Sequence, residues 1–244
     1  MREALFRSLD SIAIAREIQG AQHAVCYAAP GIQQEPAKAM AELAKRIGPE
    51  LITVCRVFDE RVMRMGFGDL AAVKTQRDAS IVVSSASGLR MGLVIVDDEG
   101  YIFTPAALYL ESDRRPTEAP NAVRLSRDQV VEALARLSPA AKAIAMALAK
   151  TPAEREHILD QAVEISSSVV ADERFASVQT RLAEAPPVRF DVARQVRVFE
   201  PYLQYVELHL TGAAIHRRRI EIPKAIQNSA RMKASNQDSR PHSI

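Results

Sequence analysis

Short apolar runs alternate with amphipathic stretches through the first 110 residues, and this alternation limits the possible folds more than any other feature. The runs AVCYAAP, LITVCRVF and SIVVSSA end at Pro, Gly or charged residues, as buried strands do. The stretches between them, such as EPAKAMAELAKRI, have the composition and spacing of helices. Strands separated by helices of this length need crossover connections. We therefore predict an α/β domain with a mainly parallel sheet flanked by helices.

This α/β domain is expected to span residues 1–112. Its last two strands lie in GLVIVDDEGYIFTP, around the acidic turn 97–100, and add an antiparallel element. A linker with two prolines is expected over 113–124. A helical segment is expected over 125–185, because its helix starts are marked by Ser126 and by the pairs Ser138-Pro139 and Thr151-Pro152.

The chain becomes strand-like again after two consecutive prolines at 186 and 187. A basic strand region, which includes a β-hairpin that turns at Thr211-Gly212, is predicted over 188–226. Residues 227–244 contain almost no apolar side chains, so we predict that this tail is disordered.

Composition excludes several classes of protein. The chain has 244 residues, of which 48% are hydrophobic, and only two of them are cysteines, so neither a disulfide scaffold nor a wholly disordered chain is expected. Charged residues interrupt every long apolar stretch, including the one at the N-terminus. We therefore expect a soluble, cytoplasmic protein that does not bind a membrane.

Motifs for cofactors and metals are weak. The run 66–71 (GFGDLA) has the spacing of a dinucleotide fingerprint, but it follows the second predicted strand at a distance, so we interpret it as a turn that caps a helix. The five histidines are scattered, and no metal site is predicted. Cys26 and Cys55 lie within consecutive apolar strands and are interpreted as core residues. No cofactor is predicted.

The segment 88–109, GLRMGLVIVDDEGYIFTPAALY, resembles the signature region of the phospholipase D superfamily. In that family a His, a Lys two residues later and an Asp five residues further on (HxKx4D) precede a strand, a turn and a second strand. The upstream runs AVCYAAPGI, LITVCRVFDE and MGFGDLAAV also resemble the family, so that the similarity covers about residues 8–111. The resemblance implies a phospholipase D-like α/β fold.

Two of the three signature positions differ from the family. Arg90 replaces the nucleophilic His and Gly92 replaces the Lys, whereas Asp97 matches the Asp. An arginine stays protonated and cannot act as a nucleophile, so no catalytic residue is predicted here. Arg90 is expected either to contact phosphate or to be a solvated loop residue, and Asp97 is alternatively a turn residue.

The family resemblance also implies a partner. Active members combine two signature-bearing halves, in one chain or across a homodimer, and this chain contains one such half. We therefore expect a homodimer.

The C-terminal part of the chain is basic. Residues 188–244 contain 10 Lys and Arg against 5 Asp and Glu. Arg217, Arg218, Arg219, Lys224 and Tyr205 are candidate contacts to the phosphates and bases of nucleic acid or to another polyanion. The alternative is that these basic residues protect an edge strand from aggregation.

Together these features predict a non-catalytic binding or scaffold protein that contacts a phosphate-bearing partner such as nucleic acid. The alternative is a phosphodiesterase or nuclease whose catalytic groups lie outside the signature or come from a partner. A structural role with a protein partner is also open.

Overall fold

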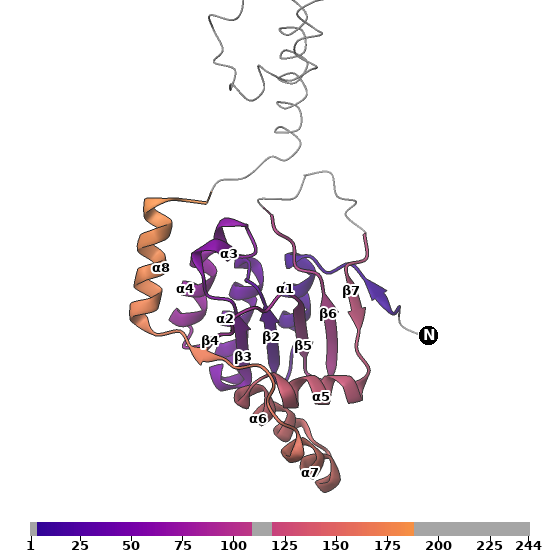
Figure 1. Cartoon of the computed structure of the whole chain (residues 1–244). Coiled ribbons are helices and arrows are strands. Elements are labelled where there is room, and N and C mark those ends of the chain that lie inside the picture. The colour runs from indigo at the N-terminus through magenta and orange to yellow at the C-terminus, as the bar shows by residue number, and fades with distance from the viewer. Residues whose placement is uncertain (1–3, 109–118, 188–244) are drawn as a thin grey trace, which may run out of the picture. The chain divides into compact units, whose positions relative to one another are not determined.

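The described part of the chain is built on one eight-stranded sheet, with the strand order β1-β7-β6-β5-β2-β3-β4-β8 (Figure 1). The computed structural model describes residues 4–108 and 119–187. Its strands are β1 (Phe6–Arg7), β2 (Val25–Ala29), β3 (Ile52–Arg56), β4 (Val83–Ser85), β5 (Gly92–Val96), β6 (Glu99–Phe103), β7 (Ala122–Arg124) and β8 (Ser168–Val169).

The helices lie between these strands, except for the last one, which follows β8. They are α1 (Ser11–Gly20), α2 (Gln34–Ile47), α3 (Glu60–Arg64), α4 (Leu70–Asp78), α5 (Arg127–Leu137), α6 (Pro139–Leu148), α7 (Pro152–Asp160) and α8 (Asp172–Glu184), with a short 3-10 helix at Pro49–Leu51. The predicted α/β class is confirmed.

The sheet is mixed rather than mainly parallel, which corrects the expected topology. Only the pairs β2–β3 and β3–β4 are parallel, and the other five strand pairs are antiparallel. The reason lies in the short loop 86–91 between β4 and β5. It contains no helix that returns the chain to the start of the sheet, so β5 runs back along β2 in the opposite direction.

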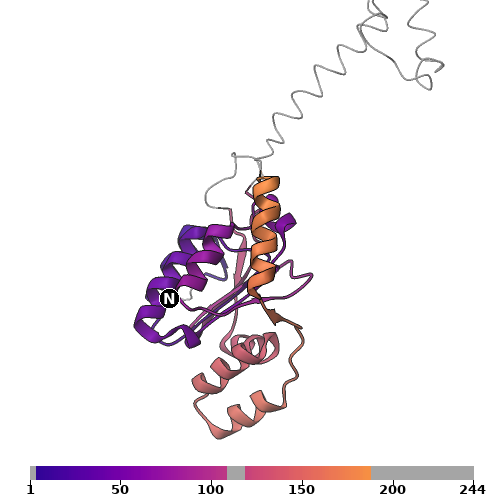
Figure 2. The same cartoon turned by 90° about the vertical axis from the view of Figure 1, so that its left-hand side faces the viewer.

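Side-chain alternation along the strands divides the core between the two faces of the sheet. Val25 and Tyr27 on β2 pack in a cluster with α1, α2, α4 and α8. Cys26 and Ala28 point the other way, into a cluster with α5, α6 and α7. Figure 2 shows α1, α2 and α4 on one side of the strands and α5, α6 and α7 on the other. Both faces of the central strands are therefore buried, which explains their nearly continuous apolar sequence.

The helix starts expected in 125–185 are confirmed. The side chains of Ser126 and Thr151 form capping boxes at α5 and α7, and the Ser138 side chain accepts a hydrogen bond from Ala141 N at the start of α6. The same segment also contains β8. Residues 122–124, at the end of the expected linker 113–124, form β7 and pair with β6 and β1.

The chain divides into two units, Met1–Phe190 and Asp191–Ile244. The expected basic region 188–226 and the tail 227–244 lie outside the described residues. Over the ranges 4–108 and 119–187, we find no helix with the length and apolar character needed to cross a membrane.

Candidate functional site

The three signature-equivalent residues do not meet in one cleft. Arg90 is exposed in the loop before β5, Gly92 is the buried first residue of β5, and Asp97 follows the last residue of the same strand. A five-residue strand spans about 16 Å, so Arg90 and Asp97 lie at opposite ends of β5. Gly92 faces the ring of Phe103, which occupies the space that a larger side chain would need.

Asp97 has a clear structural role. Its carboxylate accepts hydrogen bonds from the backbone N–H groups of Gln22 (2.9 Å), His23 (2.7 Å) and Ala24 (3.0 Å). Its own N–H donates to the carbonyl of Ala24 at 2.9 Å. The residue has a φ of 55°, in the left-handed region that Asp tolerates better than most residues. Asp97 thus fastens the turn between β5 and β6 to the segment that enters β2.

A different arginine lies in a more unusual position. Arg56 is the last residue of β3, where its neighbours across the strands are Ala29 on β2 and Ser85 on β4. Its side chain lies on the α2–α4 face of the sheet and is only 1% exposed. In the part of the chain that the structure describes, its buried Nε and Nη2 atoms have no hydrogen-bond partner. Buried guanidinium groups normally pair with carboxylates or carbonyls, so this one lacks its usual partners.

The charged groups around Arg56 do not compensate the positive charge of its guanidinium. Among the described ion pairs, none includes Arg56. Burial lowers the pKa of its guanidinium to about 9, against the opposing influence of Tyr27 and Asp69. The Asp69 carboxylate already accepts a hydrogen bond from Ala72 N at 2.6 Å, as the N-cap of α4. At neutral pH the site therefore contains a buried positive charge that has no direct counterion among residues 4–108 and 119–187.

Two loops close the end of the sheet at which Arg56 lies. The backbones of Gly31 and Gly68 are so close that a Cβ on Gly31 would lie 2.6 Å from the Phe67 carbonyl group. The Tyr27 hydroxyl donates to the Gly31 carbonyl at 3.0 Å, and Gln33 Nε2 donates to the Gly66 carbonyl at 2.8 Å. This is the carboxyl end of the parallel strands β2, β3 and β4, the end at which α/β proteins bind their ligands.

The surroundings of Arg56 combine polar and aromatic groups. The guanidinium carbon lies 5.2 Å from the centre of the Phe58 ring. Ser85 is buried beside Arg56, and its Oγ accepts a hydrogen bond from Phe58 N at 3.3 Å. Helix α2 starts just beyond Gly31, and its N-cap residue Gln33 makes no side-chain capping bond. The positive end of that helix dipole adds to the favourable potential for an anion.

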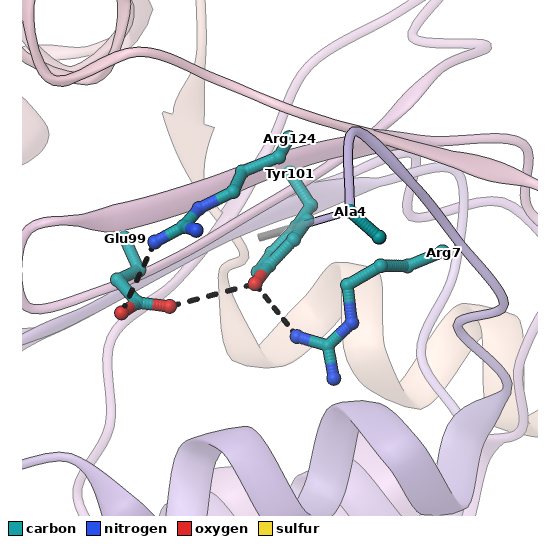
Figure 3. Close-up of a pocket in the computed structure, with 5 residues that line it drawn as sticks. All are labelled: Ala4, Arg7, Glu99, Tyr101 and Arg124. Atoms are coloured by element: carbon teal, nitrogen blue, oxygen red, sulfur yellow. Dashed lines mark hydrogen bonds and ion pairs between the residues drawn. The ribbon is translucent and has the colours of Figure 1, made fainter. Parts of the chain in front are cut away.

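A second polar cluster lies near the β1 edge of the sheet, on the α1 face, around a pocket of about 250 Å³ (Figure 3). Arg7 Nη1 donates to the Tyr101 hydroxyl at 2.7 Å and forms an ion pair of 3.0 Å with Glu17. Arg124 forms an ion pair of 3.3 Å with Glu99. Each cation here has a carboxylate partner, so the cluster links β1, β6, β7 and α1 without an excess of positive charge.

The remaining motifs have structural roles. The GFGDLA run contains the turn before α4, and its Asp69 caps that helix, as expected. Cys26 and Cys55 are free thiols in the core, also as expected, and burial raises the pKa of both. Within residues 4–108 and 119–187 there is no group of three or more His, Cys, Asp or Glu side chains arranged to hold a metal ion.

The predicted contacts Tyr205, Arg217, Arg218, Arg219 and Lys224 lie outside the described residues. Arg56, by contrast, was not predicted from the sequence. Its only signal is a charged residue inside the apolar run LITVCRVF, and the same pattern is found where a strand ends at the surface.

Comparisons with protein-family models, with curated proteins and with solved structures found no match to this chain.

Proposed function

We propose that this chain is a non-catalytic, phospholipase D-like binding protein that holds a phosphate-bearing ligand at Arg56. The observation that supports this proposal is the buried guanidinium whose Nε and Nη2 have no partner. Both atoms carry N–H donors, and guanidinium donors match the oxygens of a phosphate group in a bidentate arrangement.

Energetics favour a ligand at this position. Leaving a charged group buried and unpaired costs several kcal/mol, on the order of the stability of a small domain. A phosphate oxygen on Nε or Nη2 removes this cost, and it does so in a site from which water is largely excluded. The carboxyl end of parallel strands is also the usual place for a ligand in an α/β protein.

The chemistry of the signature positions supports binding rather than catalysis. Arg90 and Gly92 cannot supply the nucleophile and the ammonium group of the phospholipase D signature. The Asp97 carboxylate is engaged with three backbone N–H groups. These residues are therefore suited to maintaining a fold rather than to cleaving a phosphodiester.

The proposal includes partners of two kinds. The excess of basic residues in 188–244 favours nucleic acid as a phosphate-bearing partner of that basic part, in addition to the phosphate group at Arg56. The single signature-bearing half favours a homodimer. Light scattering at high micromolar concentration tests the dimer, and a clean monomer contradicts it.

Isothermal calorimetry of the full chain with inorganic phosphate and with a nucleoside 5′-monophosphate tests the Arg56 site. The variant Arg56→Met keeps a long apolar side chain but removes the charge. We expect it to weaken binding by about 10- to 100-fold, because a hydrogen bond to a charged group contributes roughly 1.5–3 kcal/mol.

The matched control is Arg16→Met, which removes an exposed arginine from α1 and is expected to bind like the unaltered protein. Equal affinity of Arg56→Met and the unaltered protein contradicts the proposal. Hydrolysis of bis(4-nitrophenyl) phosphate by the purified chain favours the phosphodiesterase alternative instead.

A further inference from the structure

Helix α8 touches the residue that covers Arg56. The Phe58 ring stacks on Phe175 of α8, with ring centres 6.0 Å apart and planes 11° from parallel. The same Phe58 ring lies 5.2 Å from the Arg56 guanidinium. Arg174 of α8 also donates from Nη2 to the Phe58 carbonyl at 2.9 Å. A single residue thus connects the buried cation to a helix more than 110 positions away in the sequence.

Helix α8 buries few of its residues, although Phe175 also packs against the core and its ring centre lies 4.7 Å from the Arg77 guanidinium. Only Val178 and Leu182 of its 13 residues are buried. Its other contacts include an exposed hydrogen bond from Arg64 Nη2 to the Arg181 carbonyl at 2.9 Å and an ion pair of 3.1 Å between Arg181 and Glu60. Because the Arg181 side chain is 57% exposed, solvent screens this ion pair and its contribution is small. Elements with few buried contacts open at a lower free-energy cost than the core does.

Access to Arg56 requires an opening of this kind. Arg56 is 1% exposed and Phe58 is fully buried, so a ligand cannot reach the guanidinium while every element stays in place. When α8 is docked, its Phe175 contributes to the burial of Phe58, whose ring lies 5.2 Å from the Arg56 guanidinium. Docking therefore costs more when Arg56 is unpaired than when an anion compensates its charge.

We infer that α8 is a hinged cover of the Arg56 site and that a phosphate group on Arg56 holds this cover closed. This inference rests on the proposed function, because it assumes that a phosphate binds there. The coupling is reciprocal: a bound phosphate favours docking of α8, and a docked α8 slows release of the phosphate. Loss of the phosphate loosens α8, the last described helix before the basic region 188–244.

Hydrogen exchange of the full chain, followed by mass spectrometry with and without inorganic phosphate, tests the cover. We expect phosphate to slow exchange of the α8 amides by about 5- to 150-fold, the usual range of such coupling. The amides of α1 serve as an internal reference and should not respond.

Two variants separate the cover from the site. Arg56→Met removes the uncompensated charge, so we expect slow exchange of α8 without phosphate and no further response to it. Phe175→Ala removes the stack on Phe58, so we expect faster exchange of α8 and, by reciprocity, weaker phosphate binding. The control Arg16→Met should behave like the unaltered chain.

The possible outcomes distinguish the two proposals. If phosphate binds in calorimetry but α8 exchange does not change, the cover is excluded and the binding site stands. If Phe175→Ala speeds α8 exchange yet leaves phosphate affinity unchanged, the coupling is likewise excluded. If phosphate does not bind at all, the proposed function fails, and the cover fails with it.

Discussion

Individual residues at the two ends of β5 show why a matching motif position does not identify a site. Asp97 is the one signature position that matches the family, and its carboxylate is engaged with the N–H groups of Gln22, His23 and Ala24. Arg90, the residue aligned with the family nucleophile, is exposed in a loop at the other end of the strand. The buried cation that lacks a partner is Arg56, which no motif includes.

The role of Asp97 leads to a prediction of stability. Asp97→Ala removes three hydrogen bonds to a carboxylate and places a less tolerant residue at a φ of 55°. We expect the free energy of unfolding to fall by about 3 kcal/mol, as measured by urea denaturation. Asp98→Ala changes the exposed neighbour and should cost under about 0.5 kcal/mol. Similar losses in both variants contradict the anchoring role of Asp97.

The core thiols predict how stability depends on pH. Burial raises the pKa of Cys26 and Cys55 above the value of 9.0 of an exposed thiol. In the unfolded chain both thiols ionise as the pH passes about 9, whereas in the folded chain they stay protonated. Their contribution to stability is complete below that pH and is lost as the pH rises.

We therefore expect the free energy of unfolding to decrease between pH 8 and pH 10, with a slope that approaches about 1.4 kcal/mol per pH unit for each thiol. Urea denaturation over this range measures the slope, and Cys26→Ala should make it shallower. Rapid labelling of both thiols by a disulfide reagent in the folded protein contradicts their burial.

At the scale of elements, the positions of strands and helices are easier to predict from the sequence than their order. Fully buried strands such as β2 and β3 have apolar runs of the expected length, and Ser or Thr caps mark the starts of α5, α6 and α7. The sheet is less parallel than expected because no residue in the loop 86–91 specifies that β5 inserts beside β2, antiparallel to it, rather than beyond β4. The position of a strand in a sheet is a tertiary property without a local pattern.

Gly31 allows the loop after β2 to lie directly against the loop before α4. Gly31→Ala places a methyl group 2.6 Å from the backbone of Phe67, which cannot move as a flexible side chain would. We expect a loss of about 1–3 kcal/mol in stability and weaker phosphate binding, because the loops around Arg56 must separate. Denaturation and calorimetry on the same sample measure the two effects.

Gly20→Ala provides the matched control. No atom lies within 4 Å of the position that its new Cβ would occupy at the end of α1. Alanine is also the better helix former, so this variant should be neutral or slightly more stable. If the two glycine variants behave alike, the close contact between the loops does not stabilise the protein.

At the scale of the whole molecule, charge is distributed unevenly along the chain. The net charge of +2 combines a slightly acidic part, residues 1–187, with a basic part, residues 188–244. The composition, with 48% hydrophobic residues, is sufficient for a core, although the α/β class is predicted from the alternation of apolar and amphipathic stretches instead. It did not predict Arg56, because one buried cation changes neither the composition nor the hydropathy pattern.

The two proposed phosphate contacts are the basic part and the Arg56 site, and a mobility-shift assay with a single-stranded oligonucleotide distinguishes them. Replacing Arg217, Arg218 and Arg219 with Ala should weaken binding and reduce the slope of log affinity against log salt by up to about 2, since each contact to a single strand contributes roughly 0.7. Arg56→Met should leave this slope unchanged, because a guanidinium that is only 1% exposed is not reached by a polymer backbone. Unchanged binding in the triple variant excludes the basic region as the nucleic-acid contact. If instead only Arg56→Met abolishes the mobility shift, the buried site itself binds the nucleic acid, through a terminal phosphate.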